Sequence, residues 1–92
     1  MRTIWKFSLP KSKQTLTVPA KFIPRSVQFQ GPKNGIQVWA EVEDDSPFVH
    51  REFTIIGTGH PVPWDTTYLG TVVEEDGAYV WHIYMGNPQA IQ

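Results

Sequence analysis

Residues 68–85 read YLGTVVEEDGAYVWHIYM, and this stretch decides the fold of the 92-residue chain. Two runs rich in Val, Thr, Tyr, Ile and Trp, residue types that favour a pleated sheet, flank the pair Asp76-Gly77. An Asp-Gly pair indicates a two-residue hairpin turn, because both central positions of that turn need positive φ. The turn predicts the cross-strand pairs Val73 with Val80, Thr71 with His82, and Leu69 with Tyr84. One face of this hairpin is apolar and is expected to lie in the core: Tyr68, Gly70, Val72, Trp81, Ile83 and Met85.

Short alternating segments continue through the rest of the chain. Eight Pro and seven Gly interrupt them, and no segment sustains the apolar spacing of a long helix. Strands are predicted over 2–9, 14–18, 26–30, 35–42 and 49–58, and the 26–30/35–42 hairpin sets Phe29 opposite Ile36 and Val27 opposite Val38. Pro at both ends of residues 19–24 predicts an irregular crossing or a single helical turn there.

These segments predict an all-β fold, a small antiparallel meander of six or seven strands that forms a barrel or a sandwich. Residues 1–85 are expected to form a single β domain, and residues 86–92 a flexible tail. The chain is short, but four Trp, five Phe and three Tyr suffice for one core.

Composition excludes several classes of function. A net charge of -1 and a pI near 6.3 disfavour strong nucleic-acid binding, and no apolar stretch can span a bilayer or act as a signal peptide. The absence of Cys excludes disulfides and thiolate sites and fits a reducing cytoplasm. His50, His60 and His82 lack chelating spacing, so neither a metal nor another cofactor is predicted.

The most unusual local sequence is Gly57-Thr58-Gly59-His60, which precedes a Pro-flanked loop ending near Trp64 and Asp65. A Gly-x-Gly without a following helix or Lys is a weak phosphate signal, and a strand-ending bulge or turn is the favoured explanation. Two combinations could in principle catalyse hydrolysis: Ser46 with His60 and Asp65, or Glu52 with Asp65. Neither has a recognisable frame, so no enzyme is predicted.

Large aromatic side chains outside the predicted core indicate recognition instead. Trp39 falls on a polar strand face and Trp64 in the long loop, and exposed Trp is enriched at binding hot spots. The alternative is that Trp64 folds back and closes one end of the domain. The predicted binding residues are Trp39, Gly57, Thr58, Gly59, His60, Trp64 and Asp65.

Most of residues 3–84 resembles a family of small uncharacterised proteins encoded by tailed phages and prophages. The resemblance rests on residues 3–7 (TIWKF), 26–28 (SVQ), 38–40 (VWA), 53–61 (FTIIGTGHP) and 68–71 (YLGT), and on the aromatic strand around His82. It implies a viral context and no catalytic residues.

Three functions remain open from the sequence. The first is a phage or prophage accessory protein that binds a host or phage protein, without catalysis, in the host cell cytoplasm. The second is a virion or assembly component that self-associates into a homo-oligomer through an unpaired edge strand. The third is a small-ligand or carbohydrate binder that uses exposed Trp as a stacking platform.

Overall fold

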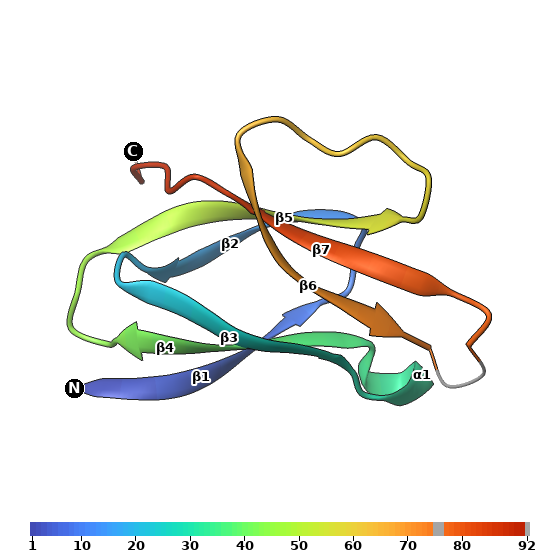
Figure 1. Cartoon of the computed structure of the whole chain (residues 1–92). Coiled ribbons are helices and arrows are strands. Elements are labelled where there is room, and N and C mark those ends of the chain that lie inside the picture. Colours follow the sequence, from blue (N-terminus) through green and yellow to red (C-terminus); the bar gives the residue numbers. More distant parts are fainter. Residues whose placement is uncertain (75–76, 92) are drawn as a thin grey trace.

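The computed structural model describes residues 1–74 and 77–91, and this part of the chain contains seven strands and one helical turn (Figure 1). In chain order they are β1 (Arg2–Leu9), β2 (Lys13–Pro19), β3 (Phe22–Phe29), α1 (Gly31–Asn34), β4 (Ile36–Glu43), β5 (Phe48–Gly57), β6 (Thr66–Val73) and β7 (Val80–Gly86). The prediction of an all-β fold is confirmed. None of the described helical residues forms a segment long and apolar enough to cross a membrane.

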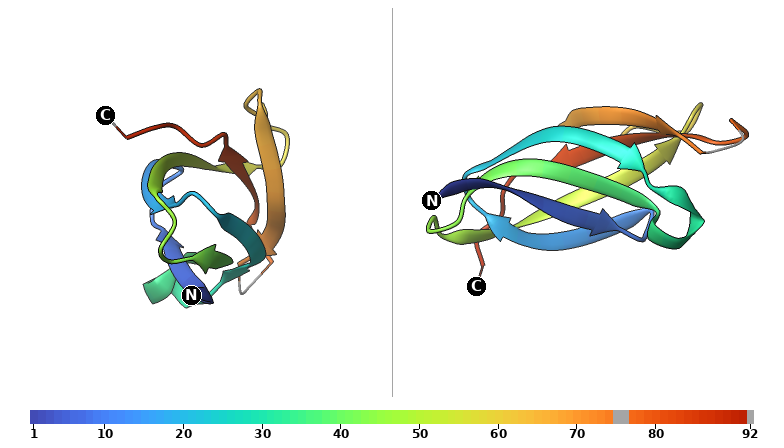
Figure 2. Two further views of the ribbon diagram at one scale, coloured as in Figure 1. Left: turned by 90° about the vertical axis from the view of Figure 1, so that its left-hand side faces the viewer. Right: turned by 90° about the horizontal axis from the view of Figure 1, so that it is seen from below.

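The strands form two antiparallel sheets that face each other (Figure 2). The first sheet has the order β1-β4-β3, and the second has the order β2-β5-β7-β6. Within the described residues, the backbone pairing gives these two sheets and not a closed barrel. The sheets approach each other closely where β3 meets β6, because a methyl group on Gly70 would lie 3.4 Å from Val27 Cγ2.

The core lies between the sheets and draws residues from both. Its fully buried apolar side chains include Val18, Val38, Val42, Phe53 and Ile83. Phe22 and Phe53 meet edge to face across the core, with ring centroids 6.0 Å apart. Arg51 also points inward, where its guanidinium donates to Met85 Sδ at 3.1 Å, and burial lowers the pKa of this arginine.

The hairpin of β3 and β4 has the predicted register. Phe29 pairs with Ile36 and Val27 with Val38, and α1 fills the connection, with the Gly35 amide donating to the Gly31 carbonyl at 2.8 Å. The expected irregular crossing or helical turn over residues 19–24 is wrong. Strand β2 runs to Pro19 and β3 begins at Phe22, with a register shift between Pro24 and Ser26. Both strands lie at sheet edges, where the missing amide of Pro is tolerated.

The hairpin of β6 and β7 has the predicted pairs Val73–Val80 and Thr71–His82, but the predicted pair of Leu69 with Tyr84 is wrong. A register shift between Tyr68 and Gly70 sets Tyr68 opposite Tyr84 instead. A bulge inserts one residue and thereby exchanges the faces of the side chains beyond it. Leu69 therefore packs against the core, while Tyr68 is 53% exposed and lies 5.5 Å from the Tyr84 ring on the outer face.

The turn between these strands includes Gly77, which has a φ of 73° and donates to the Glu74 carbonyl at 2.8 Å. The predicted turn position of Asp76 lies outside the described residues. Beyond β7, the expected flexible tail is attached to β5 at one point, where His50 and Gln89 exchange two backbone hydrogen bonds of 2.9 and 2.8 Å. The last strand includes Gly86, one residue beyond the predicted domain end.

Replacing Gly77 tests the backbone requirement of this turn. Because a β-branched residue is strained at positive φ and open space surrounds Gly77, Gly77→Val should lower the free energy of unfolding by about 1 kcal/mol or more through the backbone alone. Gly77→Asn is the matched control and should lose less, since Asn tolerates positive φ. Urea denaturation measures both variants, and equal midpoints for Gly77→Val and the parent chain would contradict the assignment.

Candidate binding site

The connection from β5 to β6, residues 58–65, lies over the outer face of the four-stranded sheet (Figure 1). Ile56 points outward from β5, opposite His82 on β7, yet only 6% of it is exposed. The loop covers the Ile56 side chain, since Ile56 and several loop residues line the same hollow. The site is therefore built from one loop and from the sheet face beneath it.

The loop begins with a tight turn at the end of β5. The His60 amide donates to the Gly57 carbonyl at 3.1 Å, and Gly59 has a φ of 90°. The His60 ring lies over Gly57, where an added methyl group would be 3.2 Å from His60 Cδ2. The two glycines thus permit a turn and a close side-chain approach, as expected for a strand-ending turn.

A chain of hydrogen bonds ties the loop to β7 and β6. His82 Nε2 lies 2.9 Å from Thr58 Oγ1, and His82 Nδ1 lies 3.0 Å from Thr71 Oγ1, which also bonds to the Tyr68 hydroxyl. The contact of His82 with Thr71 was predicted from their cross-strand position. Its contact with Thr58 was not, because this bond joins a loop to a strand 24 residues away. A hollow of about 180 Å³ lies beside these hydrogen bonds, and its lining includes His60, His82 and Tyr84.

A larger groove of about 480 Å³ lies between the end of the loop and the tail after β7. Its floor is the outer face of β2 and β5, its first wall is residues 63–66, and its second wall is formed by Gly86, Asn87 and Gln89. Trp64 lines the groove and is 93% exposed, so it does not close the end of the domain. Among the remaining lining residues are Thr15, His50, Glu52 and Asp65.

The groove brings together two carboxylates predicted as one alternative for hydrolysis, Glu52 and Asp65. Lys13 Nζ lies 3.7 Å from Glu52, and Asp65 has a positive φ of 56°. Both side chains are open to water, whereas a catalytic acid is kept protonated by apolar enclosure. Asp tolerates positive φ better than most residues, so the φ of Asp65 does not indicate strain.

The other hydrolytic combination is not assembled. Ser46 lies in the turn before β5, where its hydroxyl donates to the Glu43 carbonyl at 2.7 Å. His60 lies beyond the other end of this ten-residue strand, which spans about 33 Å at the usual rise per residue. Ser46 therefore serves the turn and does not meet His60.

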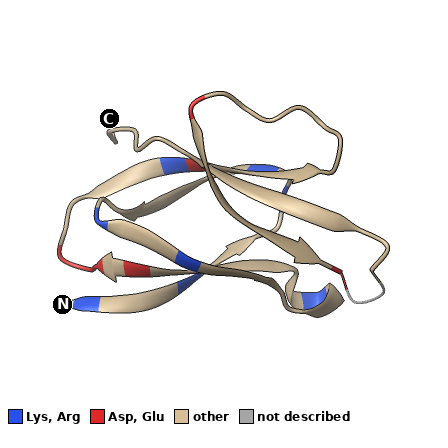
Figure 3. Ribbon diagram, viewed as in Figure 1, with Lys and Arg blue, Asp and Glu red and all other residues tan. Residues whose placement is uncertain are grey.

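Trp39 lies on the outer face of the three-stranded sheet, away from the other predicted binding residues. It is half-buried, and Lys6 Nζ lies 5.8 Å from its ring centroid. Further along this face the Arg25 guanidinium donates to Glu41 at 2.8 Å and lowers the pKa of that carboxyl. Lys and Arg are dispersed over the described strands, α1 and the connections, and do not gather along one element (Figure 3).

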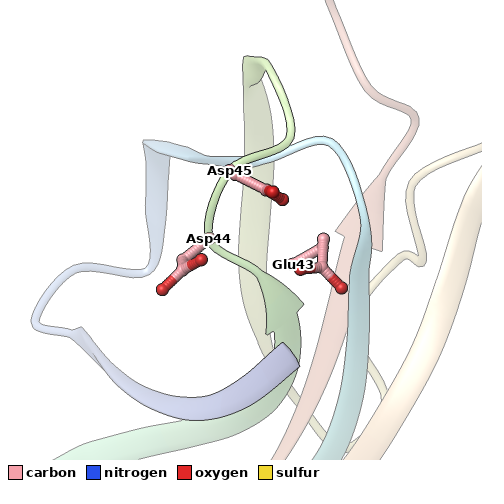
Figure 4. Close-up of side chains that lie close together, drawn as sticks. All are labelled: Glu43, Asp44 and Asp45. Carbon is pink, nitrogen blue, oxygen red and sulfur yellow. The ribbon is translucent and has the colours of Figure 1, made fainter. Parts of the chain in front are cut away.

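The end of β4 and the turn after it hold three neighbouring carboxylates, those of Glu43, Asp44 and Asp45 (Figure 4). The Met1 ammonium lies 2.8 Å from Glu43 Oε1 and 2.8 Å from Asp44 Oδ1. These bonds raise the pKa of the Met1 amine to about 10. The cluster thus already contacts a cation of the chain itself. In the described part of the chain, the three His do not form a comparable group of metal ligands.

Comparison with known proteins gives one match. No curated protein and no solved structure matches the chain. The model of a family described as a domain of unknown function, DUF7352, matches residues 1–92. Because the match covers the whole sequence, the chain belongs to the DUF7352 family.

Proposed function

We propose that this domain is a recognition module without catalytic activity, which binds another protein through residues 59–66 with Trp64 as the anchor. The observation that carries the proposal is the 93% exposure of Trp64. A Trp side chain buries about 150–250 Å² when it is covered, so its exposure forgoes a large stabilisation of the isolated domain. Trp is also among the residues that contribute most to the binding energy of protein interfaces.

The loop that presents Trp64 is stiff, which favours binding. Pro61 and Pro63 fix two of its φ angles. At the end of the loop, Thr66 Oγ1 donates a hydrogen bond of 2.8 Å to the Pro63 carbonyl, so this bond spans Trp64. At the start of the loop, the hydrogen bond between Thr58 and His82 attaches it to β7. A loop that is already ordered loses little conformational entropy when a partner binds.

The proposed contact involves one side of the molecule. Gly57, Thr58, Gly59 and His60 position the loop, while Trp64 and Asp65 contact the partner beside the groove. Trp39 lies on the other sheet and is excluded from this contact. The resemblance to small phage and prophage proteins supports a partner in the host cell cytoplasm, either a host protein or another phage protein.

Thr58→Val tests whether the bond to His82 orders the loop. Loss of one hydrogen bond, worth about 0.5–1.5 kcal/mol, should favour local opening about twofold to thirteenfold. Hydrogen exchange of the loop amides measures this opening. Thr3→Val in β1 is the matched control and should leave these amides unchanged. Unchanged exchange in Thr58→Val would show that other contacts order the loop.

Trp64→Ala tests the proposed anchor. Since nothing covers its side chain, the variant should keep the melting temperature of the parent chain and lose the protein captured by affinity purification from infected host cells. Trp39→Ala should keep that protein. Phe53→Ala should instead fail by unfolding, because truncating a buried Phe costs about 3–5 kcal/mol. Capture of the same protein by Trp64→Ala and the parent chain would refute the proposal.

A further inference from the structure

We infer that the partner inserts a cationic side chain, Arg or Lys, into the groove beside Trp64. This inference rests on the proposed function and specifies the chemistry of the partner. It follows from three properties of the groove: its charge, its exposed aromatic ring and its uncharged hydrogen-bond acceptors.

The charge of the groove is negative. Its lining includes two carboxylates, on Glu52 and Asp65, and the His50 imidazole, which lies 3.1 Å from Thr17 Oγ1, but no Lys or Arg from the described part of the chain. Lys13 lies 3.7 Å from Glu52 but does not line the groove. A cation that enters therefore meets a carboxylate on the floor and another on the wall. An anionic ligand would be repelled by both.

The aromatic ring adds a preference for cations over neutral groups. The face of Trp attracts ammonium and guanidinium ions, and the attraction reaches about 2 kcal/mol where water is excluded. Trp64 and Asp65 are neighbours in the loop, so one wall offers both the ring and a carboxylate. A guanidinium can stack on the ring with its face while its edge donates to carboxylates.

The remaining lining residues can accept the other donors of such a group. Asn87 and Gln89 on the tail side carry side-chain carbonyl oxygens, and Thr15 on the floor carries a hydroxyl. A volume of about 480 Å³ lies in the range typical of ligand sites. A neutral saccharide could use the same acceptors and the same ring, but it would bring no positive charge to Asp65 or to Glu52, whose cationic contact is Lys13 at 3.7 Å.

Binding of matched peptides to the ¹⁵N-labelled full chain tests the inference. The probes are Gly-Ser-Arg-Ser-Gly and the same peptide with citrulline, the uncharged analogue of Arg. The Arg peptide should shift the amide resonances of Thr66, Asn87 and Gln89, and the citrulline peptide should bind about tenfold more weakly, as expected for a loss of 1.4 kcal/mol. Added salt should weaken the binding of the Arg peptide, because salt screens the attraction between exposed charges.

Three variants assign the effect to the groove. Glu52→Gln and Asp65→Asn should each weaken binding of the Arg peptide, and Asn suits the positive φ of position 65. Asp45→Asn removes the same charge from an exposed turn outside the groove and should bind normally. Equal binding of the two peptides, shifts produced equally by maltose, or no shifts at all would overturn the inference.

The same variants separate this inference from the proposed function. If Trp64→Ala loses the captured protein while Glu52→Gln and Asp65→Asn keep it, the loop binds a partner but the cationic side chain is refuted. If the Arg peptide binds as expected while Trp64→Ala keeps the captured protein, the groove recognises a cation but the protein contact lies elsewhere.

Discussion

Burial of one face of β4 is the constraint on which the rest of the structure depends. Ile36, Val38, Ala40 and Val42 alternate along this strand, and all four are buried. Strand β4 lies between β1 and β3, so its backbone is paired on both edges while these side chains pack against the opposite sheet. A slip of one residue would turn all four away from the core, which fixes the register of the first sheet.

The strands of this fold could be predicted because they alternate with a period of two. The pairs of Phe29 with Ile36 and of Thr71 with His82 follow from that alternation and from turn residues alone. The bulge near Leu69 could not be predicted, because it depends on packing against residues distant in sequence. The prediction of an irregular crossing or helical turn over residues 19–24 was wrong because it rested on the two prolines. An edge strand tolerates Pro, and the sequence does not reveal which strands lie at an edge.

The candidate site, like the fold, could be predicted only in part from the sequence. The sequence indicated the loop, Trp64 and Asp65, because glycines, prolines and an unplaced Trp stand out locally. It did not indicate Thr15, Asn87 or Gln89, since the groove forms only when β2, β5, the loop and the tail come together. Trp39 was predicted beside Trp64 as a binding residue, but the division of the strands into two sheets places it on a different face.

The attachment of the tail has a consequence for the size of the groove. One wall contains Asn87 and Gln89, and the backbone of that wall is joined to β5 by the two hydrogen bonds between His50 and Gln89. Releasing them is a local transition that leaves both sheets paired, and such openings cost far less than global unfolding. The width of the groove on the tail side therefore depends on this attachment, whereas separate hydrogen bonds, of Thr66 with Pro63 and of Thr58 with His82, hold the loop on the other side.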